Sequence, residues 1–466
     1  MRAWRRTSMK VLVCGAGQVG YGIAEQLSAE GNDVTMIDVR PDLVQKVNDT
    51  LEARAYVGNG AHPDVLERAG ARDCDMIIAV TLHDEINMVA AQVAGALFDV
   101  PTKIARVRAQ TYLNKEWSKL FSRGSMGIDV IISPEREVGE MVLRRLSLPG
   151  AFDTVSFADG AVTSIGLTCD SDCPVLDTPL RQLSELFPDL PAVVVAIQRK
   201  GELIVPHSDD HLVEGDDVYV VTPASQVART LGIFGQTEAP TRRVVIAGGG
   251  NVGLYVAREL ERRHSGVRVK VIEASRTRAV EIADHLERTV VLHGNALSEE
   301  LLREAEVTSA DTIVALTNDD QVNILACALA KQLGAARSLC LVNSSGYASV
   351  IRSFDIDSEI NPRVVTVSRI LQHVRRGRIL AVHSVANGAG ELMEAEALET
   401  APIIGKALKD LPQLSGVRVG AIVRGGKVIV PHGDTQVQVK DHVILFAAAE
   451  SVRDVEQLFR VSIEFF

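Results

Sequence analysis

The sequence predicts two tandem, doubly wound parallel α/β domains, each followed by a small α+β subdomain. Three observations predict this fold class. A glycine-rich stretch that begins at Gly15 returns at Gly248, about half the chain length later. Apolar runs alternate with helical stretches around both copies, which is the order of elements in parallel α/β folds. The segments that follow the two alternating regions also resemble each other.

Around the first glycine stretch, from Lys10 to about Leu148, apolar runs and helical stretches alternate six times. The stretch at 85–97, for example, places its apolar residues at helix spacing. Strands that alternate with helices in this way form a parallel sheet covered on both faces. The expected strands are 11–14, 34–37, 55–57, 76–80, 104–107 and 130–132.

Residues 242–377 repeat this order, and the two copies agree far from the glycines. Asp75–Thr81 resembles Asp311–Thr317, and Asp84–Asn87 resembles Asp320–Asn323. Agreement over this length indicates a duplicated unit rather than chance similarity.

The segments after each copy are also duplicated, since Leu203–His207 resembles Val428–His432. Both contain short apolar runs and tight turns. We therefore expect an N-terminal extension, a first nucleotide-binding domain with its subdomain, a linker, and a second domain with its subdomain. The expected boundaries are 1–8, 9–150, 151–234, 235–241, 242–380 and 381–466.

Composition excludes several classes of function. The 466 residues carry a net charge of −11, and only 4% of them are aromatic. Nucleic-acid binders normally present a basic face or aromatic stacking platforms, so we expect no nucleic-acid partner. No apolar run approaches the ~18–20 residues of a membrane span, and residues 1–10 lack the apolar stretch of a signal peptide, which predicts a cytoplasmic protein. The close pair Cys169 and Cys173 has no matching second pair, so we expect no structural metal.

The first glycine stretch lies between a strand and a helix, which is the setting of a Rossmann dinucleotide-binding turn. In that setting Gly15 permits the tight turn, Gly17 lets the backbone approach a pyrophosphate, and Gly20 allows close helix–strand packing. The N-terminus of the following helix offers N–H groups and the positive end of its dipole to phosphates. Asp38 ends the next strand, where a carboxylate would bind a ribose diol and repel a 2′-phosphate. The pattern therefore favours NAD(H) over NADP(H).

The second copy keeps all three glycines, at Gly248, Gly250 and Gly253. Glu273 takes the acidic position and can serve the same ribose diol. However, Arg276 and Arg278 lie close to it in sequence, so the second pocket could prefer another adenine nucleotide. The alternative is that this second motif only packs a helix on a sheet.

Polar residues also follow other strands of the predicted sheets. Thr81 and Thr317 end the fourth strands, on the carboxyl edge where ligands of open α/β sheets lie, and Leu82 would line the same crevice. Arg106 or Arg108, at the end of the fifth strand, could reach a phosphate or ribose. The alternative for either arginine is a solvated or ion-paired side chain.

The sequence predicts no catalytic residue and no metal ligand. The subdomains that follow the two domains are short and duplicate each other, so little room remains for a substrate domain. His207 and His432 recur in them, but the preceding Ile-Val-Pro favours sheet packing over catalysis. The basic cluster Arg375–Arg378 is typical of a solvated helix face, with an acidic partner or phospholipid headgroups as the alternative. Two further functions stay open: an NAD-dependent oxidoreductase, and a soluble redox sensor that acts on another partner.

The residues quoted above resemble a known family. Residues 9–150, with Met9–Gly20, Asp84–Asn87 and Ile104–Arg108, resemble the RCK or KTN nucleotide-binding domains of potassium-conductance regulators. Residues 242–380 resemble them too, and the following segments resemble the family's small C-terminal subdomains. Two such pairs in one chain resemble the peripheral regulatory subunits of bacterial potassium uptake.

The resemblance implies a cytoplasmic, peripherally membrane-associated regulator that gates a membrane potassium-translocating subunit of the TrkH/TrkG type. It also implies a homo-oligomeric, tetrameric ring, with NAD(H) and ATP or ADP in the crevices. A small polar residue would be less surprising than Leu82, so that position would offer only backbone contact. The motifs and the resemblance together give the expected nucleotide-binding residues: Gly15, Ala16, Gly17, Gln18, Val19, Gly20, Asp38, Thr81, Leu82, Arg106, Gly248, Gly249, Gly250, Asn251, Val252, Gly253, Glu273 and Thr317.

Overall fold

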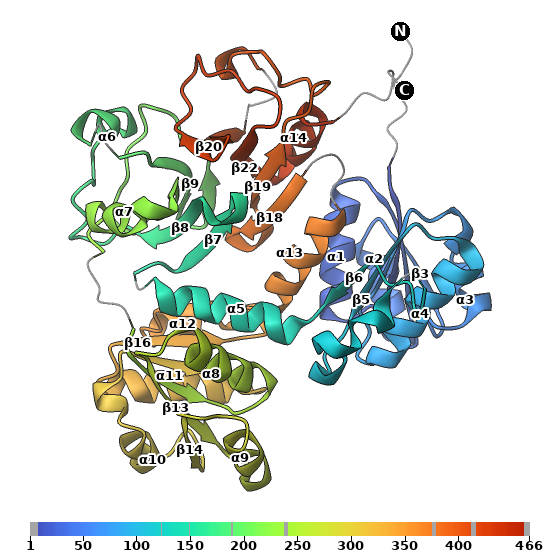
Figure 1. The fold of residues 1–466 in the computed structure, drawn as a ribbon, viewed down its shortest axis with the longest axis horizontal. Coiled ribbons are helices and arrows are strands. Elements are labelled where there is room, and N and C mark those ends of the chain that lie inside the picture. The colour runs from blue at the N-terminus through green and yellow to red at the C-terminus, as the bar shows by residue number, and fades with distance from the viewer. Residues whose placement is uncertain are drawn as a thin grey trace. The chain divides into compact units, whose positions relative to one another are not determined.

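The computed structural model describes residues 8–122, 124–148, 150–187, 190–236, 241–374, 379–411 and 416–460. These residues form two compact units. One unit holds the first parallel sheet together with the helix at 362–374, and the other holds most of the remaining elements (Figure 1). The predicted fold class is confirmed, because two parallel sheets alternate along the chain with two smaller sheets.

The first sheet has six parallel strands in the order β3-β2-β1-β4-β5-β6. The strand order reverses between β1 and β4, which is where ligands bind in open sheets of this kind. The strands are β1 Lys10–Cys14, β2 Asp33–Asp38, β3 Arg54–Val57, β4 Met76–Ala79, β5 Thr102–Arg106 and β6 Val130–Ile132. The helices are α1 Gln18–Ala29, α2 Pro41–Thr50, α3 Pro63–Arg68, α4 Asp84–Phe98 and α5 Pro134–Ser147.

The second parallel sheet repeats this order as β14-β13-β12-β15-β16-β17. Its strands are β12 Arg243–Ala247, β13 Arg268–Glu273, β14 Val290–His293, β15 Thr312–Ala315, β16 Arg337–Leu341 and β17 Ser358–Ile360. Its helices are α8 Asn251–Arg263, α9 Arg276–Ala283, α10 Glu299–Glu304, α11 Asp320–Leu333, α12 Ala348–Ser353 and α13 Pro362–Val374.

Each parallel sheet is followed by an antiparallel sheet of five strands, ordered β10-β9-β11-β8-β7 and β18-β19-β22-β20-β21. The first comprises β7 Asp153–Phe157, β8 Val162–Thr168, β9 Val193–Arg199, β10 Glu202–Ile204 and β11 Asp217–Pro223, with α6 Leu180–Leu186 and α7 Val227–Ile233. The second comprises β18 Ile379–Val385, β19 Gly390–Glu396, β20 Val417–Arg424, β21 Lys427–Ile429 and β22 His442–Ala448, with α14 Val452–Leu458.

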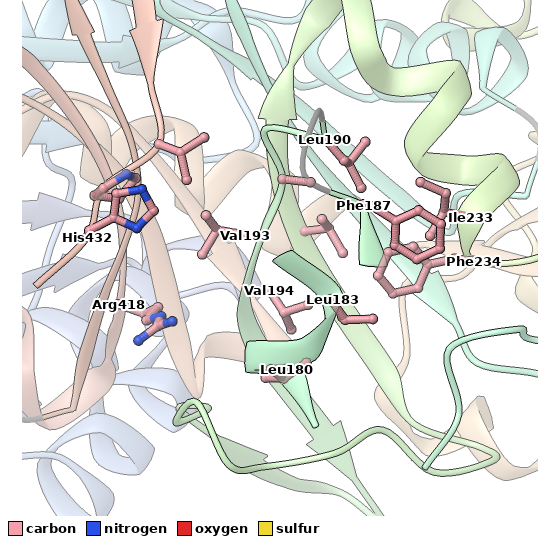
Figure 2. Close-up of a pocket in the computed structure, with 14 residues that line it drawn as sticks. Leu180, Leu183, Phe187, Leu190, Val193, Val194, Ile233, Phe234, Arg418 and His432 are labelled. Carbon is pink, nitrogen blue, oxygen red and sulfur yellow. The ribbon is translucent and has the colours of Figure 1, made fainter. Parts of the chain in front are cut away.

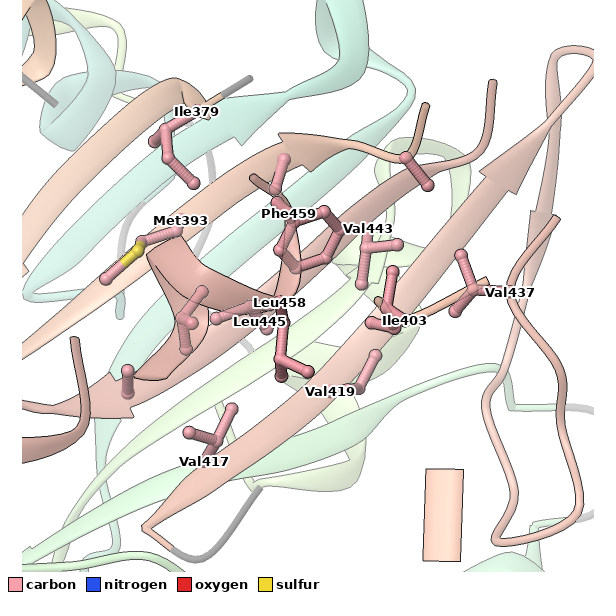
Figure 3. Close-up of a cluster of buried hydrophobic side chains, with 14 of the residues drawn as sticks. Ile379, Met393, Ile403, Val417, Val419, Val437, Val443, Leu445, Leu458 and Phe459 are labelled. Carbon is pink, nitrogen blue, oxygen red and sulfur yellow. The ribbon is translucent and has the colours of Figure 1, made fainter. Parts of the chain in front are cut away.

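The central strands of the small sheets are buried on both faces. In β22, Val443 and Leu445 point into the core of their own subdomain, where Phe459 closes the cluster (Figure 3). Ile444 and Phe446 lie in a different cluster. Because successive side chains of a strand point to opposite faces, these two pairs must pack against different partners. A strand buried in this way reads as a continuous apolar run, without alternation of polar residues.

The second cluster joins the two small sheets to each other. Ile444 and Phe446 of one sheet pack in it with Tyr219 and Val221 of the other. The approach is close, since a Cβ added at Gly420 would lie 2.8 Å from the Cβ of Val221. The two subdomains therefore form one sandwich with a shared core.

Two helices pack away from the sheet that precedes them in the chain. Helix α13 follows the second parallel sheet, but it packs on α1, where Val367 and Leu371 join the core of the first sheet. Conversely, Tyr255 of α8 donates a hydrogen bond of 2.6 Å to Glu140 of α5. A Cβ at Gly139 would overlap the same tyrosine ring. Helix α13 of the second half thus packs on the first half, and helix α5 of the first half contacts the second half.

A buried acid–base pair links the outer strands of the two small sheets. Asp153 of β7 lies 2.7 Å from Nε2 of His383 in β18, and both side chains are 12% exposed. Burial alone would raise the pKa of Asp153, but His383 and Arg145 outweigh burial and lower this pKa to about 2. The carboxylate is therefore held in its charged form across the neutral range.

We expect Asp153→Asn to reduce the free energy of unfolding by about 2 kcal/mol near pH 5, and by much less near pH 2. The folded pKa lies below the ordinary value near 4, so the stabilisation is complete above that value and is lost as the pH falls through 2. Denaturant unfolding over this pH range measures it, with the exposed Asp159→Asn as control. Equal destabilisation at both pH values would contradict the assignment.

Candidate functional site

The first glycine turn has the tight geometry that the motif predicts. Gly15 adopts φ +107°, and a Cβ there would lie 2.9 Å from the backbone nitrogen of Thr81. A Cβ at Gly20 would overlap the carbonyl oxygen of Gly15. Only glycine fits both positions, and the close fit places the N-terminus of α1 directly on the turn.

Gly17 borders open space. It is the N-cap of α1, and no side chain caps this helix end and no acidic residue lies in its first turn. A Cβ added at Gly17 would meet no atom within 4 Å. The N–H groups of Gln18 and Val19 therefore begin a helix whose positive end is not neutralised by its own side chains, which suits an anion such as a phosphate.

Asp38 is fixed beside this turn. Its Oδ2 accepts a hydrogen bond of 2.6 Å from the Ala16 nitrogen, and its Oδ1 accepts one of 2.9 Å from the Arg40 nitrogen. A carboxylate has about four acceptor positions, so two of them stay available for ribose hydroxyls. The structure places this predicted site residue next to the glycine turn.

The end of β4 is held by a residue whose role the sequence analysis missed. Asn87 is fully buried, and its Oδ1 accepts from both the nitrogen and the hydroxyl of Thr81, at 2.8 and 2.7 Å. Its Nδ2 donates to the carbonyls of Thr81 and Arg106, at 3.1 and 3.0 Å. The Thr81 hydroxyl is thus used inside the protein, and Leu82, 74% exposed, stands at the rim. The repeated Asp-x-x-Asn pattern was the available signal.

The structure separates the two candidate arginines. Arg108 is ion-paired, with Nε 2.7 Å from Glu135. Arg106 is half-buried, and its buried Nε has no hydrogen-bond partner in the part of the chain that the structure describes. Burial, followed by the charge of Arg108, lowers the pKa of Arg106. A desolvated guanidinium at the carboxyl edge of the sheet suits an anionic ligand, which favours Arg106 over Arg108 as the binding residue.

The second turn repeats the backbone geometry. Gly248 also adopts φ +107°, and Gly250 caps α8 with open space around its Cα. Glu273 accepts hydrogen bonds from the nitrogens of Gly249 and Ser275, at 2.8 and 2.7 Å. Asn323 repeats the contacts of Asn87: its Oδ1 accepts from the nitrogen of Thr317, at 2.8 Å.

The two sites differ in where their cation comes from. Leu341, whose carbonyl accepts from Asn323 at 2.9 Å, stands at the position of Arg106 in the second copy. Arg278 of α9 instead lies against the second turn, and its Nε donates to the carbonyl of Gly249 at 2.9 Å. Its Nη1 pairs with Glu281 at 2.8 Å. The second turn is therefore covered by an arginine that already has partners.

The prediction of sheet packing for the two histidines is wrong. His207 and His432 are exposed, in loops that follow the short strands β10 and β21. Each strand ends at the isoleucine of Ile-Val-Pro-His, so the histidine emerges past the sheet edge. The cluster Arg375–Arg378 lies outside the described residues.

The described residues show no group of three or more His, Cys, Asp or Glu side chains placed to hold a metal ion. Among the described helices, none is both long enough and apolar enough to cross a bilayer.

Comparison with protein families matches both kinds of domain twice. The TrkA-N domain model matches residues 11–134 and 244–362. The TrkA-C domain model matches residues 166–235 and 392–460.

Full-length relatives carry a consistent name. The chain is 60% identical to the Trk system potassium uptake protein TrkA of Azorhizobium caulinodans, with 98% of this chain and 100% of that protein covered. It is 40% identical to the protein of the same name in Halomonas elongata, again over 98% and 100%.

Among solved structures, the GsuK RCK domain is similar with a TM-score of 0.60 at 18% identity, covering 98% of this chain and 96% of that chain. The GsuK channel bound to NAD gives a TM-score of 0.60 at 18% identity, covering 98% and 80%. At this identity the likeness shows the fold alone.

We expect Asn87→Ala and Asn323→Ala each to destabilise the domain that contains it by about 2 kcal/mol. Each change leaves the buried nitrogen of the preceding threonine without its acceptor. Native-state hydrogen exchange resolves the two domains, and the exposed Gln92→Ala on α4 is the control. Unchanged exchange of the β4 or β15 amides would show that the asparagines do not hold these strand ends.

Proposed function

The chain belongs to the TrkA family, and we propose that it is the nucleotide-binding regulatory subunit of a Trk-type potassium uptake system. In this proposal it acts on the cytoplasmic side of the membrane. It assembles as a homo-oligomeric, tetrameric ring and contacts a potassium-translocating subunit of the TrkH/TrkG type. The observation that carries the nucleotide-binding part is the open Gly17 turn, flanked by Asp38 and by a half-buried Arg106 whose Nε has no hydrogen-bond partner among the described residues.

We propose NAD(H) as the ligand of the first site. The N-terminus of α1 would hold the pyrophosphate, and the free acceptor positions of Asp38 would hold a ribose diol. Arg106 would add a cation to the phosphates. The NAD bound to the GsuK channel, which shares this fold, supports the proposal.

The second site has the same turn and a carboxylate, Glu273, in the same place. We propose that it takes an adenine nucleotide, either NAD(H) or ATP or ADP. Its cation, Arg278, must exchange its contact with the Gly249 carbonyl for the ligand's phosphates. This exchange costs binding energy, so affinity at the second site should be lower than at the first for the same ligand.

Nucleotides would act on transport through linked equilibria. A ligand shifts a two-state equilibrium only by its difference in affinity for the two states, ~1.4 kcal/mol for each tenfold ratio. A dinucleotide and a mononucleotide fill different lengths of one crevice, so they can favour different conformations. The ligand's phosphates on the glycine turn and its ribose on the carboxylate would set this preference.

Substitutions in the first site should weaken NADH binding without unfolding the domain. We expect about tenfold weaker binding for Gly17→Val, whose side chain enters open space, and for Arg106→Leu, which copies Leu341. Calorimetric titration measures the affinity. The exposed Asp42→Asn is the control, and unchanged affinity in both site variants would place the nucleotide elsewhere.

The transport role is tested by co-purification from membranes, with and without NADH or ATP. We expect the chain to recover a potassium-translocating subunit, and the effect of NADH on potassium uptake to require a higher NADH concentration with Gly17→Val than with the wild-type chain. Steady NADH consumption with a small carbonyl substrate would instead favour the oxidoreductase. NADH binding without a transporter partner would favour the redox sensor.

A further inference from the structure

A cavity of about 130 Å³ lies between the two small subdomains. The residues that line it are far in sequence from both glycine turns. One side comes from the first subdomain, where Leu183, Phe187, Ile233 and Phe234 supply an apolar wall (Figure 2). The other side comes from β20 and from the loop after β21. Neither nucleotide site uses these residues.

One cation, Arg418, lines this cavity, whose other lining residues are apolar except for His432. Arg418 of β20 is half-buried, and its buried Nε has no hydrogen-bond partner among the described residues. Burial lowers its pKa, and no neighbouring carboxylate opposes that effect. Removing a guanidinium from water without a counter-charge is costly, so the arrangement calls for an anion.

Two other arginines, at the ends of strands in the same sheets, have the carboxylate partner that Arg418 lacks among the described residues. Arg199 of β9 binds both carboxylate oxygens of the buried Asp216, at 2.8 Å each. Arg424 of β20 binds Asp441 in the same two-point manner, at 2.9 and 2.7 Å. A two-point contact of this kind is the preferred geometry between guanidinium and carboxylate. Arg418 has no such partner in the described part of the chain.

The duplicated half shows that the fold does not require this arginine. The strand pairings place Val193 opposite Val221 in the first sheet and Arg418 opposite Phe446 in the second. These two pairs occupy equivalent positions, since Arg199 and Arg424 end the paired strands in the same way. Valine therefore satisfies the fold at this position, and the arginine needs another explanation.

We propose that this cavity binds a small organic acid, whose carboxylate contacts Arg418 and whose apolar tail packs against the apolar wall of the first subdomain. A cavity of about 150 Å³ lined by Leu, Ile and Phe takes a benzene molecule, so a cavity of about 130 Å³ suits an acid of about six carbon atoms in all, branched or cyclic. His432 lines the same cavity and offers a second polar contact. The backbone nitrogen of His432 donates a hydrogen bond of 2.8 Å to the Thr435 hydroxyl, which fixes the loop that carries the histidine. This inference goes beyond the proposed function and does not depend on it.

The test is calorimetric titration of the full-length chain with 4-methylpentanoate and with cyclopentanecarboxylate, each compared with its uncharged amide. We expect at least one acid to bind about tenfold more tightly than its amide, because only the acid forms the charge-assisted contact. Arg418→Val, which copies the first half, should remove this difference and keep NADH affinity unchanged. The exposed Lys406→Val should leave acid binding as in the wild type.

A crystal structure with the bound acid should place its carboxylate within hydrogen-bond distance of Arg418. Equal binding of acid and amide, or no binding of either acid at millimolar concentration, would overturn the proposal. Acid binding that survives Arg418→Val would overturn it as well. Weaker NADH binding in Gly17→Val, with acid binding intact, would separate this cavity from the nucleotide site.

Discussion

The shared core of the two small sheets is the constraint on which the second unit depends. Each central strand carries apolar side chains on both faces, and its own subdomain covers only one of them. The other face is buried because the second sheet lies on it, with Gly420 leaving room for Val221. Separating the sheets would expose Tyr219, Ile444 and Phe446 to water together. Burial of each large side chain contributes about 1.5–3 kcal/mol, so the sandwich is a strong link between the two halves.

Much of the fold could be predicted because each element depends on local sequence. The predicted strands appear within a few residues of their expected bounds, and the glycines occupy the positions that only glycine can adopt. The position of Asp38 also followed from the sequence, because the end of a second strand lies beside the first turn in every sheet of this order. These features need no knowledge of long-range packing.

The helix exchange could not be predicted, because the two halves are so alike. α13 has an apolar stripe that would fit either parallel sheet, and the sequence does not state which one it meets. For α13 the choice depends on contacts such as that of Val367 with the core of the first sheet, and for α5 on pairs such as Glu140 with Tyr255. Both kinds of contact join residues far apart in the chain. The histidine prediction was wrong for a related reason. Ile-Val-Pro indicates a strand, but it does not show that the strand ends before His207 and His432.

Some site residues could likewise be predicted from the sequence, and others could not. The glycines and carboxylates follow from a short motif, whereas the role of Asn87 depends on its reach to the carbonyl of Arg106 on the next strand. Strand alternation could not distinguish Arg106 from Arg108, which differ in the ion pair of Arg108 with Glu135 and in the buried Nε of Arg106. Arg278 lies close to Glu273 in sequence, but its contact with the Gly249 carbonyl depends on how α9 packs beside the second glycine turn.

The fusion of both halves into one chain has a consequence for the sandwich between the small sheets. When two identical chains meet about a two-fold axis, any change on one side of the interface appears on both sides. Here the two sides are encoded separately, so Val193 can stay valine while its counterpart becomes Arg418. The two sides of the sandwich can therefore differ at single positions. A surface that began as a structural contact can in this way acquire a recognition role on one side while the other side keeps the fold.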